Sequence, residues 1–182
     1  MAATATTTAV PPQRLIGSKE INAAIARLAS LIKDRHAETR DLLLLGIANG
    51  GSVLARRVAA TLGVTRVGDL DISFHRDDIG NHPIPKEFSP TLLPGDVNGA
   101  TVVLVDDVLF TGRTVKAALD ELFDHGRPAR VELAVLVDRG GRRMPVAADF
   151  TALTLEATDS EKVVVSLDEF SPAKDRIVIR HA

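Results

Sequence analysis

The sequence predicts a single α/β domain built on a mainly parallel sheet flanked by helices. Two short, continuous apolar runs, residues 42–47 and 102–105, are each followed by a polar turn and then by a stretch with helical periodicity. A strand buried on both faces of a parallel sheet has this continuous apolar character, whereas a strand with one exposed face alternates. At 182 residues the chain is long enough for one sizeable core, with or without a small appendage.

The first part of the chain predicts a helix on each side of the first strand. Apolar residues recur at helical spacing over residues 18–36, and the apolar run 42–47 predicts the strand. This run leads into Ala48-Asn49-Gly50-Gly51, and a second helix is expected over 52–62, ending at Gly63. Taken alone, the glycine-rich stretch indicates an ordinary strand-to-helix turn that uses glycine for its positive φ.

A long polar segment follows the third expected strand. Residues 67–74 alternate in part and predict that strand, whereas residues 75–99 contain four prolines and few apolar side chains. Connections of this length without secondary structure are typical of lids and binding loops. Arg76 lies in the charged cluster that opens the segment, where its simplest interpretation is a solvated side chain.

The most informative stretch is Val-Val-Leu-Val-Asp-Asp-Val-Leu-Phe-Thr-Gly-Arg-Thr, residues 102–114. Its apolar run ends at Asp106 and Asp107, and residues 114–125 then predict an amphipathic helix. Ligands of open α/β sheets bind at the carboxyl ends of strands, and a helix N-terminus offers unpaired N–H groups to an anion. A phosphate therefore fits at residues 111–114, while the two carboxylates can accept hydrogen bonds from paired hydroxyls or help to hold Mg²⁺. This combination describes a ribose 5-phosphate, although two aspartates alone would indicate only a strand end.

The last third predicts one more buried strand and then a small hood. Residues 131–137 form the strand, and the densest basic cluster of the chain, Asp138-Arg139-Gly140-Gly141-Arg142-Arg143, follows it. Three interpretations fit this cluster: a solvated turn, a wall beside a bound nucleotide, or an RNA-binding patch at Arg139, Arg142 and Arg143. From about residue 146 to residue 182 we expect a hood over the sheet edge, made of short β-like pieces at 150–155, 163–167 and 177–179.

Composition excludes several function classes. The chain has no cysteine, which excludes disulfides and thiolate chemistry and is compatible with the expected cytoplasmic location. No apolar run approaches the ~20 residues of a membrane span. A net charge of −2 and the lack of Trp and Tyr are unlike a general nucleic-acid binder. Residues 1–12, rich in Ala, Thr and Pro, predict a flexible tail ahead of a domain over 13–182.

The central stretch resembles the phosphoribosyl pyrophosphate motif of type I phosphoribosyltransferases. More distant segments extend the resemblance to the bacterial family of pyrimidine operon attenuators that are also uracil phosphoribosyltransferases. The resemblance covers nearly the whole chain after the tail and rests on Asp71-Ile-Ser-Phe-His-Arg-Asp-Asp78, residues 105–115, Gly126-Arg-Pro128, Leu133-Ala-Val-Leu-Val-Asp-Arg-Gly140 and Ser160-Glu-Lys-Val-Val-Val165. It implies the type I phosphoribosyltransferase fold with a C-terminal hood. It also implies a reaction in which uracil and phosphoribosyl pyrophosphate give UMP and pyrophosphate, with Mg²⁺.

The resemblance assigns roles to particular residues. Asp106 and Asp107 would grip the ribose hydroxyls and, directly or indirectly, the metal. The rest of the phosphoribosyl pyrophosphate-binding motif would be Val108, Leu109, Phe110, Thr111, Gly112, Arg113 and Thr114. The pyrophosphate loop would be Ala48, Asn49, Gly50 and Gly51, with Arg56 or Arg57 as further cations and Arg76 closing over the pyrophosphate. Uracil would lie against Lys162, Val163 and Val164, where backbone groups would read its edge.

The sequence leaves two functions of different class open. One is an enzyme, either uracil phosphoribosyltransferase or a sister enzyme that uses another base. The other is an RNA-binding transcription attenuation regulator that senses nucleotides with little or no catalysis. The resemblance implies pyrimidine operon leader RNA as a partner and a homo-oligomer, a dimer or higher. Residues 145–149 and 153–156 are apolar or acidic where RNA-binding relatives carry basic residues, which predicts weaker phosphate binding.

Overall fold

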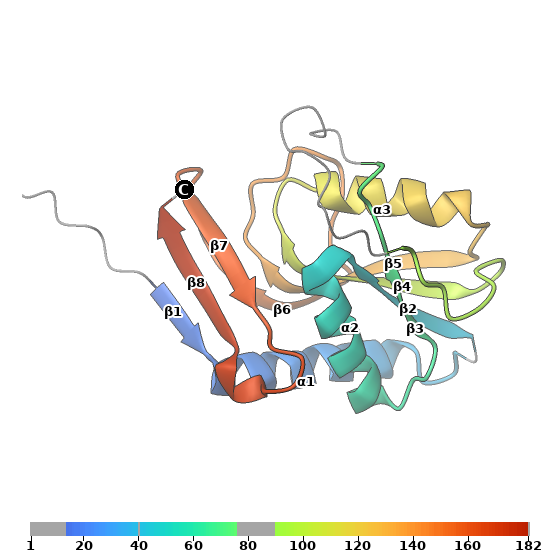
Figure 1. Ribbon diagram of the computed structural model, residues 1–182, viewed down its shortest axis with the longest axis horizontal. Helices are drawn as coiled ribbons and strands as arrows, with labels where there is room; N and C mark the ends of the chain where they lie inside the picture. The colour runs from blue at the N-terminus through green and yellow to red at the C-terminus, as the bar shows by residue number, and fades with distance from the viewer. Residues whose placement is uncertain (1–13, 40, 76–89, 182) are drawn as a thin grey trace, which may run out of the picture.

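The computed structural model describes residues 14–39, 41–75 and 90–181. The expected tail at residues 1–12 and Arg76 lie outside these ranges. The described chain forms two separate sheets, one with five strands and one with three, which Figure 1 draws side by side. Within the same ranges, no helix combines the length and the apolar character needed to cross a membrane.

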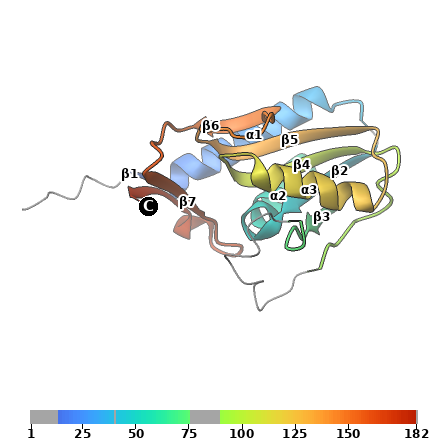
Figure 2. The same cartoon turned by 90° about the horizontal axis from the view of Figure 1, so that it is seen from above.

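The five-stranded sheet confirms the predicted α/β class. Its strands are all parallel and lie in the order β3-β2-β4-β5-β6. Two helices cover one face and the third covers the other, as Figures 1 and 2 show from two directions. The elements are α1 (Ser18–Arg35), β2 (Leu42–Ile47), α2 (Ala48–Leu62), β3 (Val67–Leu70), β4 (Thr101–Leu109), α3 (Arg113–Asp124), β5 (Arg130–Asp138) and β6 (Phe150–Thr154).

Each face of the sheet has its own apolar core. In β2 every residue is buried: Leu42 and Leu44 pack with α1 and α2, whereas Leu43 and Leu45 pack with α3. The period of two that a strand imposes on its side chains is therefore present, but helices on both faces make both sets of positions apolar. This explains why the strands look like continuous apolar runs in the sequence.

The smaller sheet, which we call the hood, combines both ends of the chain. It consists of β1 (Arg14–Gly17), β8 (Arg176–His181) and β7 (Glu161–Ser166) in the antiparallel order β1-β8-β7, with the short helix η1 (Pro172–Lys174) before β8. The structure corrects the expected composition of the hood. The piece at 150–155 is β6 of the main sheet, and β1 was not predicted because so short a strand has no local signal when its partner is distant.

Three predicted boundaries are wrong at places that matter for the site. β4 continues through Asp106 and Asp107, because its pairing with β5 extends as far as Leu109 opposite Asp138. Helix α2 begins at Ala48, directly after β2, so residues 48–51 are a helical turn and not a loop. β3 ends at Leu70 and not at residue 74. Tertiary packing, which a local pattern does not record, sets these limits.

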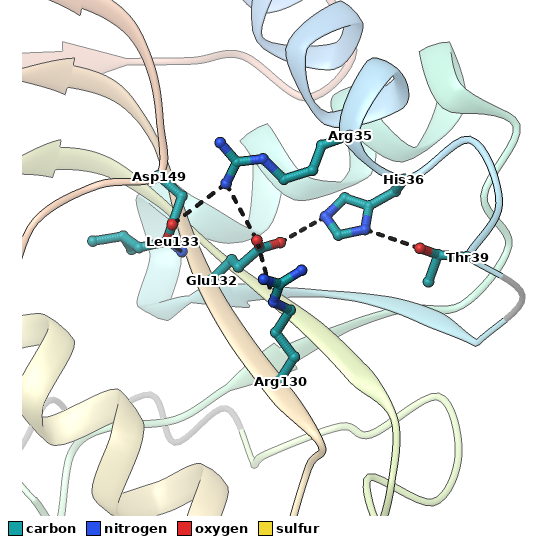
Figure 3. Close-up of polar contacts among 7 residues, drawn as sticks. All are labelled: Arg35, His36, Thr39, Arg130, Glu132, Leu133 and Asp149. Carbon is teal, nitrogen blue, oxygen red and sulfur yellow. Dashed lines mark hydrogen bonds and ion pairs between the residues drawn. The ribbon is translucent and has the colours of Figure 1, made fainter.

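A buried charge cluster ties α1 to β5 at the amino end of the main sheet (Figure 3). Glu132 is 4% exposed, and its Oε2 lies 2.6 Å from Nε2 of His36. Its Oε1 lies 3.2 Å from Nη1 of Arg35 and 3.6 Å from Nε of Arg130. Three nitrogen partners compensate the buried carboxylate. Because ligands of parallel sheets bind at the opposite, carboxyl end, this cluster belongs to the scaffold.

Arg57 on α2 connects the hood to helices α1 and α2. Its Nη1 lies 2.6 Å from Oδ2 of Asp175, whose side chain is fully buried, and its Nη2 donates to Asn22 on α1. The other oxygen of Asp175 accepts the backbone N–H of Asp168 at 2.9 Å. One guanidinium thus joins both helices to the connection between β7 and β8. A role as a pyrophosphate cation would require this pair with Asp175 to break.

Replacing Arg57 by methionine is expected to lower the free energy of unfolding by about 3 kcal/mol, because Asp175 would remain buried without its cation. Urea unfolding measures this change. The matched control is Lys116→Met, which removes the exposed Lys116–Asp120 pair within α3 and should change stability by less than about 0.5 kcal/mol. Equal effects of the two substitutions would contradict a special role for the buried pair.

Candidate functional site

Asp106 and Asp107 lie in the carboxyl half of β4, the central strand of the main sheet. Asp106 is 5% exposed and Asp107 is half-buried. Consecutive strand residues point to opposite faces, so Asp106 lies on the α3 side with Leu104, and Asp107 lies on the α2 side with Val105. Oδ1 of Asp106 accepts the backbone N–H of Asp107 at 2.9 Å. The two carboxylates therefore lie on opposite faces of the sheet, one toward each helix layer.

Burial makes both carboxyl groups hold their protons more tightly than usual. It raises the pKa of Asp106 well above its ordinary value, and the negative charge of Asp107 raises that pKa further. Burial also raises the pKa of Asp107. Ionising both groups in the free protein is unfavourable, so a ligand that brings hydroxyl donors or positive charge to them is favoured.

The start of α3 follows β4 after a three-residue loop, and its N-terminus could bind an anion. Gly112 has φ +91° at the N-cap, and a Cβ there would lie only 2.5 Å from Cγ2 of Val146, so no other residue fits without displacement. The first turn of α3, which begins at Arg113, carries no acidic side chain that would repel an anion. Of the predicted motif, Val108 and Leu109 belong to β4 and pack into the two cores, so they support the loop.

The first turn of α2 approaches the aspartates from the other face of the sheet. A Cβ at Gly50 would lie 2.3 Å from Oδ2 of Asp107, and one at Gly51 would lie 2.2 Å from the carbonyl oxygen of Val105. Two adjacent glycines therefore let the helix start lie directly against β4. This first turn also carries no acidic residue. The structure thus brings the predicted pyrophosphate segment and the aspartates together, with a helix N-terminus on each side of the carboxylate pair.

The basic turn after β5 supports the loop between β4 and α3. The carbonyl of Leu109 accepts the backbone N–H of Arg139 at 3.1 Å, and the carbonyl of Phe110 accepts Nη1 of Arg142 at 2.9 Å. The carbonyl of Thr111 accepts the backbone N–H groups of Arg143 and Met144, each at 2.9 Å. Three successive loop carbonyls are therefore bonded to this turn, which fixes the backbone that leads into α3.

The structure corrects the RNA-binding interpretation of the basic cluster for two of its three arginines. Arg139 is 6% exposed, and the guanidinium of Arg142 is bonded to loop carbonyls and paired with Asp138. Arg143 is exposed and remains a candidate. A run of arginines in a sequence indicates charge but not whether that charge is already used inside the protein.

The predicted uracil-binding residues lie on β7, the edge strand of the hood that contacts β4. Val163 is 6% exposed and packs into the core with α1 and α2, whereas Lys162 is exposed and Val164 is half-buried. Because alternate residues share a face, the three side chains do not meet one ligand together. Recognition of a base here would use the backbone and the face shared by Lys162 and Val164.

Two further side chains near the site are already paired. Asp138, to which the sequence analysis gave no role of its own within the basic cluster, ends β5 beside Leu109. It accepts the N–H of Gly140 at 2.9 Å and pairs with Arg142. The sequence did contain an indication of this position, because Asp138 is the first polar residue after a buried apolar run, as Asp106 is. Arg56 lies 3.1 Å from Asp69 and 3.2 Å from Glu169, so in this structure its charge is paired with carboxylates.

The chain is similar in sequence and in fold to known proteins. Residues 17–169 match the family model described as "Phosphoribosyl transferase domain". The chain is 44% identical over 173 residues to "Bifunctional protein PyrR" of Chloroflexus aurantiacus, with 92% of this chain and 95% of that protein covered. It is 47% identical over 156 residues to the protein of the same name from Streptomyces coelicolor, with 82% and 80% covered. A solved hypoxanthine phosphoribosyl transferase of Trypanosoma cruzi matches with a TM-score of 0.63 at 19% identity, covering 96% of this chain and 94% of that one, which shows the shared fold.

Proposed function

The chain belongs to the phosphoribosyl transferase family, and from this membership we propose that it is a uracil phosphoribosyltransferase, which converts uracil and phosphoribosyl pyrophosphate to UMP and pyrophosphate. One observation carries the proposal: a helix N-terminus lies on each side of two adjacent carboxylates, one buried and one half-buried, at the carboxyl end of the central strand. A sugar with phosphate at both ends and hydroxyls between them matches this arrangement. The choice of uracil rests on the resemblance of residues 71–78, 126–128 and 160–165 to the pyrimidine family.

In this reaction the chain binds and orients its substrates. Asp106 and Asp107 accept hydrogen bonds from the ribose hydroxyls, the start of α3 holds the 5-phosphate, and the first turn of α2 holds the pyrophosphate. The bond from C1 to pyrophosphate breaks, N1 of uracil bonds to C1, and the N1 proton leaves to solvent. The carboxylates place negative charge near the cation that develops at C1. Orientation and charge stabilisation suffice, so no covalent enzyme intermediate is needed.

The donor set fits Mg²⁺ held mainly by the substrate. Asp106 and Asp107 offer hard carboxylate oxygens whose charges repel each other. Among residues 14–39, 41–75 and 90–181, no group of three or more His, Cys, Asp or Glu side chains could hold a metal ion by itself. Mg²⁺ commonly binds through one or two carboxylates and substrate phosphates. When bound, it would neutralise charge on the pyrophosphate.

Three further parts of the proposal rest on the family resemblance. Arg76, which lies outside the described residues, would cover the pyrophosphate and exclude water during transfer. Backbone groups of β7 near Lys162 and Val164 would read the uracil edge. The enzyme would work in the cytoplasm as a dimer or larger homo-oligomer.

A second function is favoured by the relatives, which are named bifunctional proteins. It is UMP-responsive binding to pyrimidine operon leader RNA. The exposed Arg143 would contribute, but the basic turn offers a smaller patch than its composition indicates. Filter binding of labelled leader RNA over a salt series tests this function, and a shallow salt dependence is expected from few phosphate contacts. Equal binding with and without UMP would count against regulation.

The enzyme proposal is tested by following UMP formation from uracil and phosphoribosyl pyrophosphate. We expect turnover with Mg²⁺, loss of turnover when EDTA removes the metal, and recovery when Mg²⁺ is restored. Hypoxanthine in place of uracil should give no nucleotide. If the protein binds UMP but forms none under these conditions, the enzyme claim fails and the attenuation regulator becomes the better account.

A further inference from the structure

Arg139 makes a buried connection between the basic turn and the hood. It is 6% exposed at the end of β5. Its Nη1 donates to the carbonyl of Glu161, the first residue of β7, at 2.9 Å, and its Nη2 donates to the carbonyl of Thr158 at 2.9 Å. Nη2 also lies 3.4 Å from the carbonyl of Ala157. The guanidinium therefore forms hydrogen bonds with the backbone at the start of β7.

The other side of the same guanidinium lies on Phe110. Its central carbon is 3.8 Å from the centre of the Phe110 ring, which is the distance of a close cation–π contact. Gly141 contacts the same ring, since a Cβ built there would lie 2.5 Å from Cε2 of Phe110. Phe110 belongs to the predicted phosphoribosyl-binding loop. One planar group thus touches both the loop beside the ribose site and the strand beside the expected base site.

The burial of this guanidinium is unfavourable at one atom. Within the described chain, Nε of Arg139 is buried without a hydrogen-bond partner, as is Nε of Arg142. The contacts also require a planar fork of donors with a flat face, which lysine does not have.

We propose that Arg139 is a positioning residue that sets the distance between the base-binding edge of the hood and the phosphoribosyl loop. The inference rests on the proposed function, because it assumes that a base lies between β7 and β4. Arg139 does not touch the reacting atoms. It acts through Phe110 and through the backbone before β7, so that N1 of the base lies in line with C1 of the ribose. A displacement of about 1 Å in such a geometry can cost on the order of 100-fold in rate.

The test compares a ligand that spans both regions with one that occupies a single region. For Arg139→Lys, which keeps the charge, calorimetry should show UMP affinity falling at least 10-fold while ribose 5-phosphate affinity stays within about 3-fold. In steady state, the KM for uracil should rise and kcat should fall, with the KM for phosphoribosyl pyrophosphate little changed. The carbonyls of Phe110 and Thr111 keep their other donors in this variant, so the loop itself should persist.

Arg127→Lys is the matched control. Arg127 is an exposed arginine that lies 5.5 Å from the ring centre of Phe123 and donates to two backbone carbonyls outside the site. This variant should match the wild type in both affinities and in both KM values. Phe110→Leu is a second variant, which removes the ring face and keeps the hydrogen bonds of Arg139. It should shift the UMP to ribose 5-phosphate affinity ratio in the same direction by a smaller factor.

The outcomes separate this inference from the proposed function. An unchanged affinity ratio in Arg139→Lys and Phe110→Leu, with UMP formation intact in the wild type, overturns the positioning role alone. A wild type that forms no UMP overturns the uracil reaction, and the same ratio measured with GMP and AMP then decides the positioning role. If none of these nucleotides binds the wild type more tightly than ribose 5-phosphate, no base lies at the hood and the inference fails.

Discussion

Replacing Asp106 and Asp107 together by asparagine is expected to lower kcat/KM for UMP formation by at least about 10³-fold. Asparagine keeps the shape of each side chain but loses the negative charge. In the proposed reaction this charge would strengthen the hydrogen bonds from the ribose hydroxyls and stabilise the cation at C1. Each single variant should fall between the double variant and the wild type. The measurement is initial velocity with saturating Mg²⁺, using Asp34→Asn, an exposed carboxylate on α1, as the control.

The double variant should be no less stable than the wild type. Because burial raises both pKa values, the folded state binds the two protons more tightly than the unfolded chain. The stability that the protonated pair has in acid is therefore lost as the pH rises through the raised pKa values. Neutral side chains remove that loss at pH 7, so the melting temperature should stay equal or rise. A melting temperature well below that of the wild type would mean that the activity loss reflects misfolding.

Substituting Gly51 by alanine should damage both stability and activity. The new Cβ would lie 2.2 Å from the carbonyl oxygen of Val105, a backbone atom that cannot move aside without shifting α2 away from β4. Alanine favours a helix over glycine by about 1 kcal/mol, yet we expect a net loss of about 1–3 kcal/mol in the free energy of unfolding. Because the shifted helix start would no longer meet the pyrophosphate, kcat/KM should fall by at least about 10-fold.

Gly50→Ala should separate the two effects. Its Cβ would meet the Asp107 carboxylate at 2.3 Å, and a side chain can rotate away where a backbone cannot. Stability should therefore change little, while the displaced carboxylate should lower kcat/KM by about 100-fold. Gly17→Ala is the control, because nothing lies within 4 Å of its Cβ position and its φ is −89°. Equal activity in Gly50→Ala and Gly17→Ala would show that the close approach has no functional part.

The features that the sequence predicted correctly depend on neighbouring residues. The run from β4 into α3 places a buried strand, two aspartates and a glycine turn within one short stretch, so pattern and turn chemistry suffice there. The start of α2 and the length of β4 depend on packing between β2, β4 and β5, which no local pattern records. The buried contacts of Arg139 could not be predicted for the same reason, since its partners lie at residues 110, 157, 158 and 161.

The hood has a further consequence for how the protein forms during synthesis. β8 lies between β1 and β7 in the hood. Neither β1 nor β7 can therefore pair within that sheet until β8 has been synthesised. A ribosome releases the main sheet's strands well before it releases β8, and the parallel layer can begin to form while β1 is still unpaired. Closing the sheet then joins opposite ends of the chain, which is slow because of the loop entropy. The nascent chain should therefore form its parallel sheet first, and its hood only once β8 has been synthesised.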